Sequence, residues 1–314
     1  MSVAFIFPGQ GSQSVGMGRA LAERFSCARR VFEEVDATLG DNLSTVMWEG
    51  PAEKVTLTEN AQPALVAVSI AAMRVLESEA GVDLKRDASF VAGHSVGEYS
   101  ALAAAGSLSL ADAVRLVRAR GRAMQEAVPI GVGAMAALLG VEFEQAAAIA
   151  AEAARGEVVQ AANDNGAGQV VVSGHRAAVE RAVEIARAKG VRRATMLPVS
   201  GPFHSALMKP AAAVMADALG KVDVGVPVVP LVGNVLARPT SDPVEIVQGL
   251  VQQVTGTVRW RESVGFMAQA GVDLFYEVGS GKVLSGLVQR IARGARAVAI
   301  GAPEDIAAVR HIGG

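Results

Sequence analysis

Residues 89–105 read Ser-Phe-Val-Ala-Gly-His-Ser-Val-Gly-Glu-Tyr-Ser-Ala-Leu-Ala-Ala-Ala, and this stretch decides both the fold and the candidate site. The apolar run 89–92 predicts a buried strand, and the helix formers of 98–105 predict the helix that follows it. Between them, Gly93-His94-Ser95-Val96-Gly97 matches the nucleophile elbow G-x-S-x-G, in which small flanking residues let a strained strand-to-helix turn lift the serine above a sheet. Ser95 is therefore a candidate nucleophile.

The five-residue pattern is a weak signal by itself, because a chain with 34 glycines produces it by chance in roughly one case in five. Its context carries more weight, since a strand precedes it and a helix follows it. The start of that helix also directs backbone N–H groups and the positive end of its dipole to the place where an oxyanion would form. A catalytic role is therefore favoured over an ordinary tight turn.

The flanking segments extend the pattern of alternating strands and helices. Strands are predicted at 3–7, 228–232 and 274–278, a helix at 17–39, and another from Gln62-Pro63, with Pro63 in its first turn. Such alternation predicts a parallel sheet that is covered on both faces. We expect an α/β-hydrolase-like catalytic core formed by residues 1–130 and 199–314.

The spacing of the elements changes between residues 131 and 198. The order strand, helix, strand, strand, helix, strand predicts an inserted ferredoxin-like α+β subdomain that is able to fold as a separate lobe. Its expected elements, in the same order, are 134–139, 142–154, 158–162, 169–173, 177–189 and 192–197.

A serine nucleophile requires a base, and the chain has four histidines. His94 adjoins the serine and would point away from it, His175 begins a predicted helix of the insert, and His311 lies in a short C-terminal tail. His204 remains, in the loop 199–205 where the insert rejoins the core. A lone loop histidine is more often a surface residue than a base. His204 is favoured as the base because the other three histidines are eliminated.

The arginines that follow the elbow divide between two faces of a predicted helix. Arg115, Arg118 and Arg122 fall on one stripe, which is typical of a solvated face. Arg120 falls on the opposite, apolar side. An arginine there is costly unless it is paired, so Arg120 is expected either to meet an internal carboxylate or to await an anionic ligand.

Two glycine-rich segments resemble nucleotide-binding loops without meeting their requirements. The loop 8–13, Pro-Gly-Gln-Gly-Ser-Gln, brings the backbone close to a ligand after the first strand, but no lysine follows its glycines as in a Walker A loop. The segment 131–136 fits G-x-G-x-x-A but precedes a strand instead of following one. A nucleotide-hydrolysing or dinucleotide-binding site is therefore not expected.

The composition restricts partners and compartment. The 29 Lys and Arg residues nearly balance the 31 Asp and Glu residues, so no net field is available to attract nucleic acid or an anionic membrane. Cys27 is the only cysteine, which excludes a cysteine-built zinc site and fits a reducing cytoplasm. Residues 1–8 lack the features of a secretory signal, and no apolar run is long enough to span a membrane. We expect a cytoplasmic protein without a metal site.

Taken together, several segments resemble the malonyl-CoA:acyl carrier protein transacylases, and they occur in the order seen in that family. They cover nearly the whole chain, and their joint agreement is specific. The segments are 7–13 (Phe-Pro-Gly-Gln-Gly-Ser-Gln), 93–102 (Gly-His-Ser-Val-Gly-Glu-Tyr-Ser-Ala-Leu), 120–125 (Arg-Gly-Arg-Ala-Met-Gln), 163–171, 201–205 (Gly-Pro-Phe-His-Ser) and 276–284.

The resemblance implies an acyltransferase that moves malonyl from malonyl-CoA to the phosphopantetheine thiol of acyl carrier protein in fatty acid biosynthesis, with no tightly bound cofactor. It implies a role for each matching site residue: Ser95 as nucleophile, His204 as base, Arg120 as ligand of the malonyl carboxylate, Gln10 and Val96 as backbone donors of the oxyanion hole, and the Gln253 carbonyl as the group that orients the histidine. Val96 stands where leucine is common, and Pro202 and Phe203 vary the histidine loop.

Three other interpretations stay open at this point. A similar transacylase could serve a polyketide synthase or a malonate-decarboxylase system. The elbow also permits a carboxylesterase, but that function would leave Arg120 and the insert unexplained. A third possibility is a non-catalytic carrier-binding subunit, and the Ser95 and His204 pair argues against it. Arg192 and Arg193 are either contacts for an acidic carrier or an ordinary solvated strand end.

Overall fold

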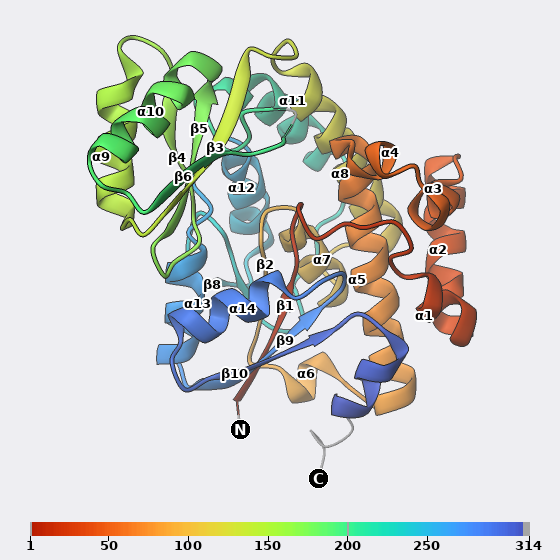
Figure 1. The fold of residues 1–314 in the computed structure, drawn as a ribbon. Helices are drawn as coiled ribbons and strands as arrows, with labels where there is room; N and C mark the ends of the chain where they lie inside the picture. The colour runs from red at the N-terminus through yellow and green to blue at the C-terminus, as the bar shows by residue number, and fades with distance from the viewer. Residues whose placement is uncertain (1, 200, 310–314) are drawn as a thin grey trace.

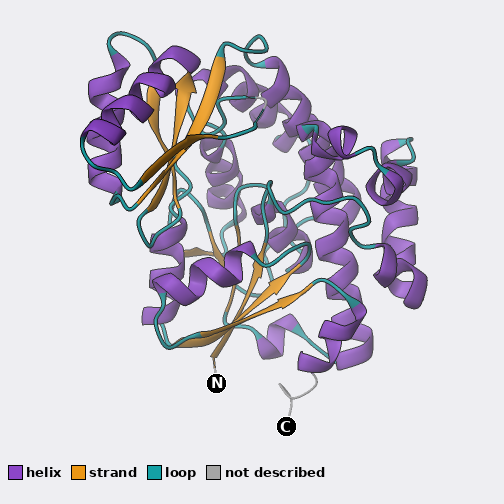
Figure 2. Ribbon diagram, in the orientation of Figure 1, coloured by secondary structure: helices purple, strands orange, loops and turns teal. Residues whose placement is uncertain are grey.

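The computed structural model describes residues 2–199 and 201–309, which form two separate β-sheets with helices around them (Figure 1, Figure 2). The larger sheet has six strands in the order β10-β9-β1-β2-β7-β8, and all its neighbours are parallel except β7 and β8. The strand bounds in that order are Arg296–Ile300, Val272–Val278, Ser2–Phe7, Phe90–Gly93, Leu231–Val232 and Pro239–Thr240. The predicted α/β fold class is confirmed.

Strand β1 lies inside the larger sheet and is buried on both faces. Its side chains alternate between two hydrophobic clusters, with Val3, Phe5 and Phe7 in one and Ala4 and Ile6 in the other. A strand whose two faces are both covered needs a continuous apolar sequence, which is what residues 3–7 provide. The strand therefore places its carboxyl end, and the loop after it, at the edge of the sheet where the elbow also lies.

Helices cover both faces of this sheet (Figure 1). The cluster of Phe5 and Phe7 is completed by α5 (Thr58–Ala80), α7 (Gly97–Ala104) and α8 (Leu110–Glu126), and the opposite cluster by α13 (Trp260–Gln269) and α14 (Val283–Ile291). The other helices of the core are α1 (Arg19–Arg24), α2 (Ser26–Leu39), α3 (Leu43–Glu49), α4 (Ala52–Thr56), α6 (Leu84–Asp87), α11 (Lys209–Leu219), α12 (Pro243–Gln253), and the 3-10 turns η1 (Ala206–Met208) and η2 (Pro303–Val309).

The smaller sheet is antiparallel, has four strands in the order β4-β5-β3-β6, and is drawn in yellow-green to green in Figure 1. It packs on two helices and has a hydrophobic core of its own. In chain order its elements are β3 (Gly133–Leu139), α9 (Phe143–Ala154), β4 (Val159–Asp164), β5 (Gln169–His175), α10 (Arg176–Ala188) and β6 (Arg193–Met196). This order of elements and of strands is the ferredoxin-like arrangement expected from the sequence.

Two helix predictions are corrected by the structure. The helix expected over 17–39 is divided into α1 and α2, because Phe25 adopts an extended conformation between them. The helix expected from Gln62 begins at Thr58, so Pro63 lies inside α5 and not in its first turn. A Cβ on Gly121 would lie 2.7 Å from the carbonyl oxygen of Thr58, so α8 packs closely on the first turn of α5 and supports it despite the proline.

Strand lengths also differ from expectation at the end of the core sequence. The run 228–232 forms only the two-residue strand β7, and it pairs with β8, which the sequence pattern did not reveal. Strand β10 at the edge of the sheet was not predicted either. Both missed strands are short or half-buried, so neither shows the continuous apolar run by which β1 was found.

The smaller sheet is attached to the core along β4. Asn163 forms an isolated parallel bridge with Val258, which lies in the core just before α13, and Asp164 forms an ion pair with Arg261 at 2.8 Å. The backbone of Val258 also donates to Ala162 at 2.8 Å and accepts from Asp164 at 2.9 Å. These contacts hold the carboxyl end of β4 against the segment that joins α12 to α13.

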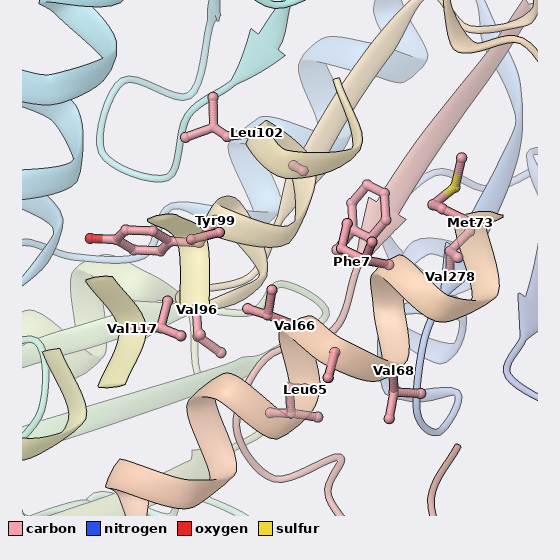
Figure 3. Packing of buried hydrophobic residues seen from close by; sticks show 14 of the residues in the cluster. Phe7, Leu65, Val66, Val68, Met73, Val96, Tyr99, Leu102, Val117 and Val278 are labelled. Atoms are coloured by element: carbon pink, nitrogen blue, oxygen red, sulfur yellow. The ribbon is translucent and has the colours of Figure 1, made fainter. Parts of the chain in front are cut away.

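The hydrophobic packing beneath the elbow is dense. Figure 3 shows Val96 and Tyr99 in the same hydrophobic cluster as Leu65 and Val66 of α5 and Val117 of α8. All these side chains are buried. Among the described helices, none combines the length and the apolar character needed to cross a membrane.

Candidate active site

Ser95 lies in a strained turn between β2 and α7. Its φ of 52° is in the left-handed region, which costs a residue with a side chain on the order of 1 kcal/mol. The glycines on either side make the turn possible: a Cβ on Gly93 would lie 1.9 Å from the carbonyl carbon of Gly97, and a Cβ on Gly97 would lie 2.2 Å from the carbonyl oxygen of Phe7. The elbow therefore has the geometry that its sequence predicts.

Asn234 holds the elbow from the loop that follows β7. Its Oδ1 accepts a hydrogen bond from the Ser95 amide at 2.7 Å, and its Nδ2 donates to the carbonyl oxygen of Gly93 at 2.6 Å. Asn234 is buried. The sequence analysis missed this residue, although its position after a strand of the parallel sheet, where site residues gather, was an available signal.

His204 contacts Ser95 and is held by a main-chain carbonyl. It lies before η1 and is buried, with a φ of 57°. Its Nδ1 lies 2.8 Å from the carbonyl oxygen of Gln253, and its Nε2 lies 2.8 Å from the Ser95 hydroxyl oxygen. Because Nδ1 donates to the carbonyl, Nε2 is left to accept the serine proton.

The protonation state of His204 suits proton acceptance. Burial, reinforced by the positive charge of Arg120 and opposed by the hydrogen bond to Gln253, lowers the pKa of His204 to about 3. The imidazole is therefore neutral near neutral pH, and its unprotonated nitrogen faces the serine.

The other histidines are placed elsewhere. Nε2 of His94 lies 2.9 Å from Oδ1 of Asn165, and the centroid of the His94 ring lies 5.7 Å from that of Trp260. Nδ1 of His175 accepts from the amide of Val158 at 2.9 Å. His311 and Ser200, which belongs to the histidine loop, lie outside the described residues.

Arg120 is a buried cation directly beside the serine, with only 1% of its surface exposed. Its Nη1 donates to Oε1 of Gln62 at 2.7 Å, and its Nη2 donates to Oε1 of Gln253 at 2.8 Å and to Oγ of Ser95 at 3.1 Å. In the described part of the chain, its Nε has no partner. These acceptors are neutral, so the cation is placed to attract an anion. Gln62, on α5, was not singled out from the sequence.

One arginine assignment is wrong. Arg118 was expected on a solvated face with Arg115 and Arg122, yet only 7% of it is exposed. Its Nη2 pairs with Asp41 at 2.8 Å and its Nη1 donates to Asn60 at 2.6 Å. The reason is tertiary: segments from before α3 and from the start of α5 fold over this part of α8, which a helical wheel cannot show. Arg115 and Arg122 are exposed and form surface ion pairs.

The loop after β1 packs against the elbow. A Cβ on Gly9 would lie 2.4 Å from the carbonyl oxygen of His94, so this loop and the elbow touch through their backbones. The next residue, Gln10, accepts a side-chain hydrogen bond from Thr58 at 3.0 Å. Val96 buries its side chain just before α7. Within residues 2–199 and 201–309, the amides of Gln10 and Val96 donate no hydrogen bond to the protein.

The smaller sheet supports the histidine loop. Oε1 of Gln160, on β4, accepts from the amide of Ala206 at 3.0 Å, while its Nε2 lies 3.4 Å from the carbonyl oxygen of His204 and 3.3 Å from that of Thr255. Sequence patterns did not indicate this contact, because Gln160 lies among buried residues in an ordinary strand pattern. No group of three or more potential metal ligands occurs among the described residues.

Comparisons with known proteins agree with this geometry. A family model described as "Acyl transferase domain" matches residues 4–307. The malonyl CoA-acyl carrier protein transacylase of Bacillus subtilis is 47% identical over 305 residues, which is 97% of this chain and 95% of the relative. The structure of the acyl-carrier-protein-S-malonyltransferase of Bartonella henselae has a TM-score of 0.98 at 54% identity and covers 100% of both chains.

A further solved structure includes a partner. It shows a malonyl-transacylase in complex with its type II PKS acyl-carrier protein, and its transacylase chain matches with a TM-score of 0.95 at 41% identity. The match covers 98% of this chain and 99% of the other.

Proposed function

The chain belongs to the acyl transferase domain family and, within it, to the malonyl CoA-acyl carrier protein transacylases, and from this membership we propose the chemical role of each site residue. The enzyme transfers the malonyl group of malonyl-CoA to an acyl carrier protein. The family expected from the sequence is therefore confirmed. The observation that carries the residue assignment is that His204 and Arg120 both lie within hydrogen-bond distance of the Ser95 hydroxyl.

In the first half-reaction, Ser95 attacks the thioester carbonyl of malonyl-CoA while Nε2 of His204 takes its proton. The oxygen that becomes negative is received by the amides of Gln10 and Val96, which are free of other acceptors in the described chain. Collapse of the tetrahedral intermediate breaks the carbon–sulfur bond, and His204 returns the proton to the CoA sulfur. The products are free CoA and a malonyl ester on Ser95.

In the second half-reaction a thiol is the attacking group, whereas in the first a thiol is the leaving group. The phosphopantetheine thiol of the carrier protein gives its proton to His204 and attacks the malonyl ester. His204 returns that proton to the serine oxygen as the carbon–oxygen bond breaks, which gives malonyl-carrier and free Ser95. Because CoA leaves before the carrier reacts, the transfer follows ping-pong kinetics. The carbonyl of Gln253 keeps Nε2 of His204 directed at the serine in both steps.

Arg120 selects the acyl group. The malonyl carboxylate is separated from the reacting carbonyl by a single methylene, and the Arg120 guanidinium lies 3.1 Å from the attacking oxygen, so one short acyl group reaches both. An acetyl group would leave the buried cation without an anionic partner. Unmet polar sites of this kind discriminate between substrates by factors of about 10⁴.

The Arg120→Ala variant tests this role. Malonyl transfer is expected to fall about 10²- to 10³-fold, with acetyl transfer retained or improved. The matched control is Arg118→Ala on the same helix, which removes a buried arginine that binds Asp41 instead of the site. The control is expected to lower stability without changing the ratio of malonyl to acetyl transfer. Equal loss of both transfers in Arg120→Ala would contradict a carboxylate-specific role.

A direct assay separates transfer from hydrolysis. Malonyl-CoA is incubated with enzyme, with and without phosphopantetheinylated carrier protein, and both malonyl-carrier and free malonate are measured. Turnover that depends on the carrier supports the transferase, whereas equal turnover without carrier would indicate an esterase. Carriers from fatty acid and polyketide systems are compared, because a structural relative binds a type II PKS carrier.

Several wider assignments accompany this function. We expect residues 1–130 and 199–314 to act as the catalytic core and 131–198 as the inserted subdomain. The enzyme is proposed to work in the cytoplasm in fatty acid biosynthesis, without a tightly bound cofactor, metal, membrane or nucleic acid. Its near-neutral charge balance and single cysteine support this setting. Arg192 and Arg193 are exposed near the start of β6, where an acidic carrier can reach them.

A further inference from the structure

Glu98 is a buried carboxylate next to the site to which the mechanism assigns no step. It lies in the first turn of α7 and has 2% of its surface exposed. Its Oε2 accepts two hydrogen bonds, one from Nε2 of Gln253 at 2.8 Å and one from the amide of Asn234 at 3.1 Å. Burying a carboxylate is unfavourable unless nearby charge and hydrogen bonds compensate for the lost hydration, so a role for Glu98 is to be sought in its contacts.

The side-chain amide of Gln253 connects Glu98 to Arg120. Its Oε1 accepts from Arg120 and its Nε2 donates to Glu98, each at 2.8 Å, so a cation lies at the oxygen end and a carboxylate at the nitrogen end. Rotating the amide by half a turn would set N–H against N–H and oxygen against oxygen. The two charges therefore fix a single orientation of this amide.

The same residue reaches both members of the catalytic pair. Nε2 of Gln253 also donates to the carbonyl oxygen of Ser95 at 3.0 Å, and the main-chain carbonyl of Gln253 accepts from His204. Through Asn234, Glu98 also supports the hydrogen bond to the Ser95 amide. The Glu98 carboxylate is thus connected by hydrogen bonds, through Gln253 and Asn234, to the elbow, the histidine and the arginine.

We propose that Glu98 is a positioning residue for malonyl transfer: its ionised carboxylate holds the Gln253 amide with the oxygen toward Arg120 and so directs the guanidinium at the malonyl carboxylate. This inference rests on the proposed function. Loss of the charge leaves the nitrogen end of the amide with only neutral acceptors, among them the Ser95 carbonyl, so the orientation of the oxygen that Arg120 binds is less firmly fixed. Misplacement of this kind within a site reduces rates by about 10²-fold when it reaches 1 Å.

The charge on Glu98 is the part of this network that titrates near neutrality. Burial raises the pKa of Glu98 to about 7, against the opposing hydrogen bonds from Gln253 and Asn234 and the charge of Arg120. Of the ionisable groups around it, Arg120 stays cationic, the pKa of Tyr99 is raised to about 12 by burial, and that of His204 is lowered to about 3. A fall in rate as the pH drops through about 7 therefore reports Glu98 and not His204.

The test compares Glu98→Gln with the wild type in single-turnover formation of the malonyl-enzyme. Glutamine is isosteric and always neutral, so it reproduces the protonated state of Glu98. At about pH 8 the variant is expected to react about 10-fold more slowly than the wild type, and at about pH 5.5 the two rates converge to within about 2-fold. The preference for malonyl over acetyl is expected to narrow by the same factor at the higher pH.

The matched control is Glu277→Gln. Glu277 is also fully buried, and it accepts the amides of Leu284 at 3.0 Å and Ser285 at 2.7 Å at the start of α14. Burial raises its pKa as well, but none of its hydrogen-bond partners is one of the assigned site residues. A rate ratio to wild type that does not change with pH is expected for Glu277→Gln. Convergence in this control would show that loss of any buried carboxylate has the effect and would overturn the proposal.

A ratio of Glu98→Gln to wild type that is independent of pH would also overturn it. If Glu98→Gln does not fold, Glu98→Asp carries the test, since it retains a titrating carboxylate that is one methylene too short. That variant is expected to be slow at about pH 8 and to lose further rate on acidification, and a flat profile would contradict the proposal. Failure of wild type to form a malonyl adduct at any pH would instead refute the proposed function.

Discussion

The two halves of the catalytic pair are positioned in different ways. Ser95 lies in a turn between two regular elements, where neighbouring glycines decide the backbone path. His204 lies in a loop at the end of the inserted segment and is held by Gln253, 49 residues away, and Gln160, 44 residues away. The nucleophile therefore depends on local backbone geometry, and the base depends on contacts between distant parts of the chain.

The dependence of Ser95 on local backbone geometry is tested most directly by filling the space that the elbow requires. In Gly93→Ala, the new Cβ would lie 1.9 Å from a backbone carbon of Gly97, and backbone has little room to yield. We expect the free energy of unfolding to fall by about 3 kcal/mol or more, and acylation of Ser95 to be lost. Chemical denaturation and intact mass measure the two effects.

Gly265→Ala in the middle of α13 is the control for that substitution. A Cβ there meets no atom within 4 Å, and the glycine is in a helix, so alanine is expected to be neutral or to stabilise by up to about 1 kcal/mol. If Gly93→Ala were tolerated as well as Gly265→Ala, the strained elbow would not be what positions Ser95.

The histidine side is tested by His204→Ala. The elbow does not depend on the imidazole, so this variant is expected to retain the fold and to acylate Ser95 about 10²- to 10⁴-fold more slowly. Single-turnover acylation by malonyl-CoA measures the loss. A rate close to wild type would show that another group accepts the serine proton and that His204 is not the base.

Contacts from the inserted segment to His204 and to the elbow test the same difference between base and nucleophile. Gln160→Ala removes the support for the histidine loop, and we expect acylation to slow about 10-fold. Asn165→Ala removes the partner of His94 behind the elbow, which glycine geometry and Asn234 already fix, so a loss of about 2-fold or less is expected. Rapid-quench acylation distinguishes the two. A larger effect of Asn165→Ala would reverse the roles assigned to the two regions.

This difference explains what was predictable from the sequence. The elbow, strand β1 and the ferredoxin-like insert follow from local patterns of glycine and hydrophobic residues, and the structure has all three. Asn234, Gln62 and Glu98 were missed because their contacts join segments that are far apart in the sequence. Their residue types are not diagnostic of a site, and only Asn234 had a positional signal, because it follows a strand of the parallel sheet.

The corrections have the same origin. Arg118 fits a solvated stripe on an isolated helix, and it is buried because Asp41 and Asn60 are folded over α8. Pro63 fits a first helical turn, and tertiary packing against Gly121 extends the helix beyond it. Local rules describe an element by itself, and they fail where another element changes its surroundings.

The central claim is that the malonyl group is carried by Ser95. Wild-type enzyme and Ser95→Ala are each mixed with malonyl-CoA and analysed by intact mass, followed by peptide mapping. We predict one malonyl adduct on the wild type, located at Ser95, which disappears when carrier protein is added, and no adduct on Ser95→Ala. A covalent malonyl adduct of equal yield on Ser95→Ala would contradict the account.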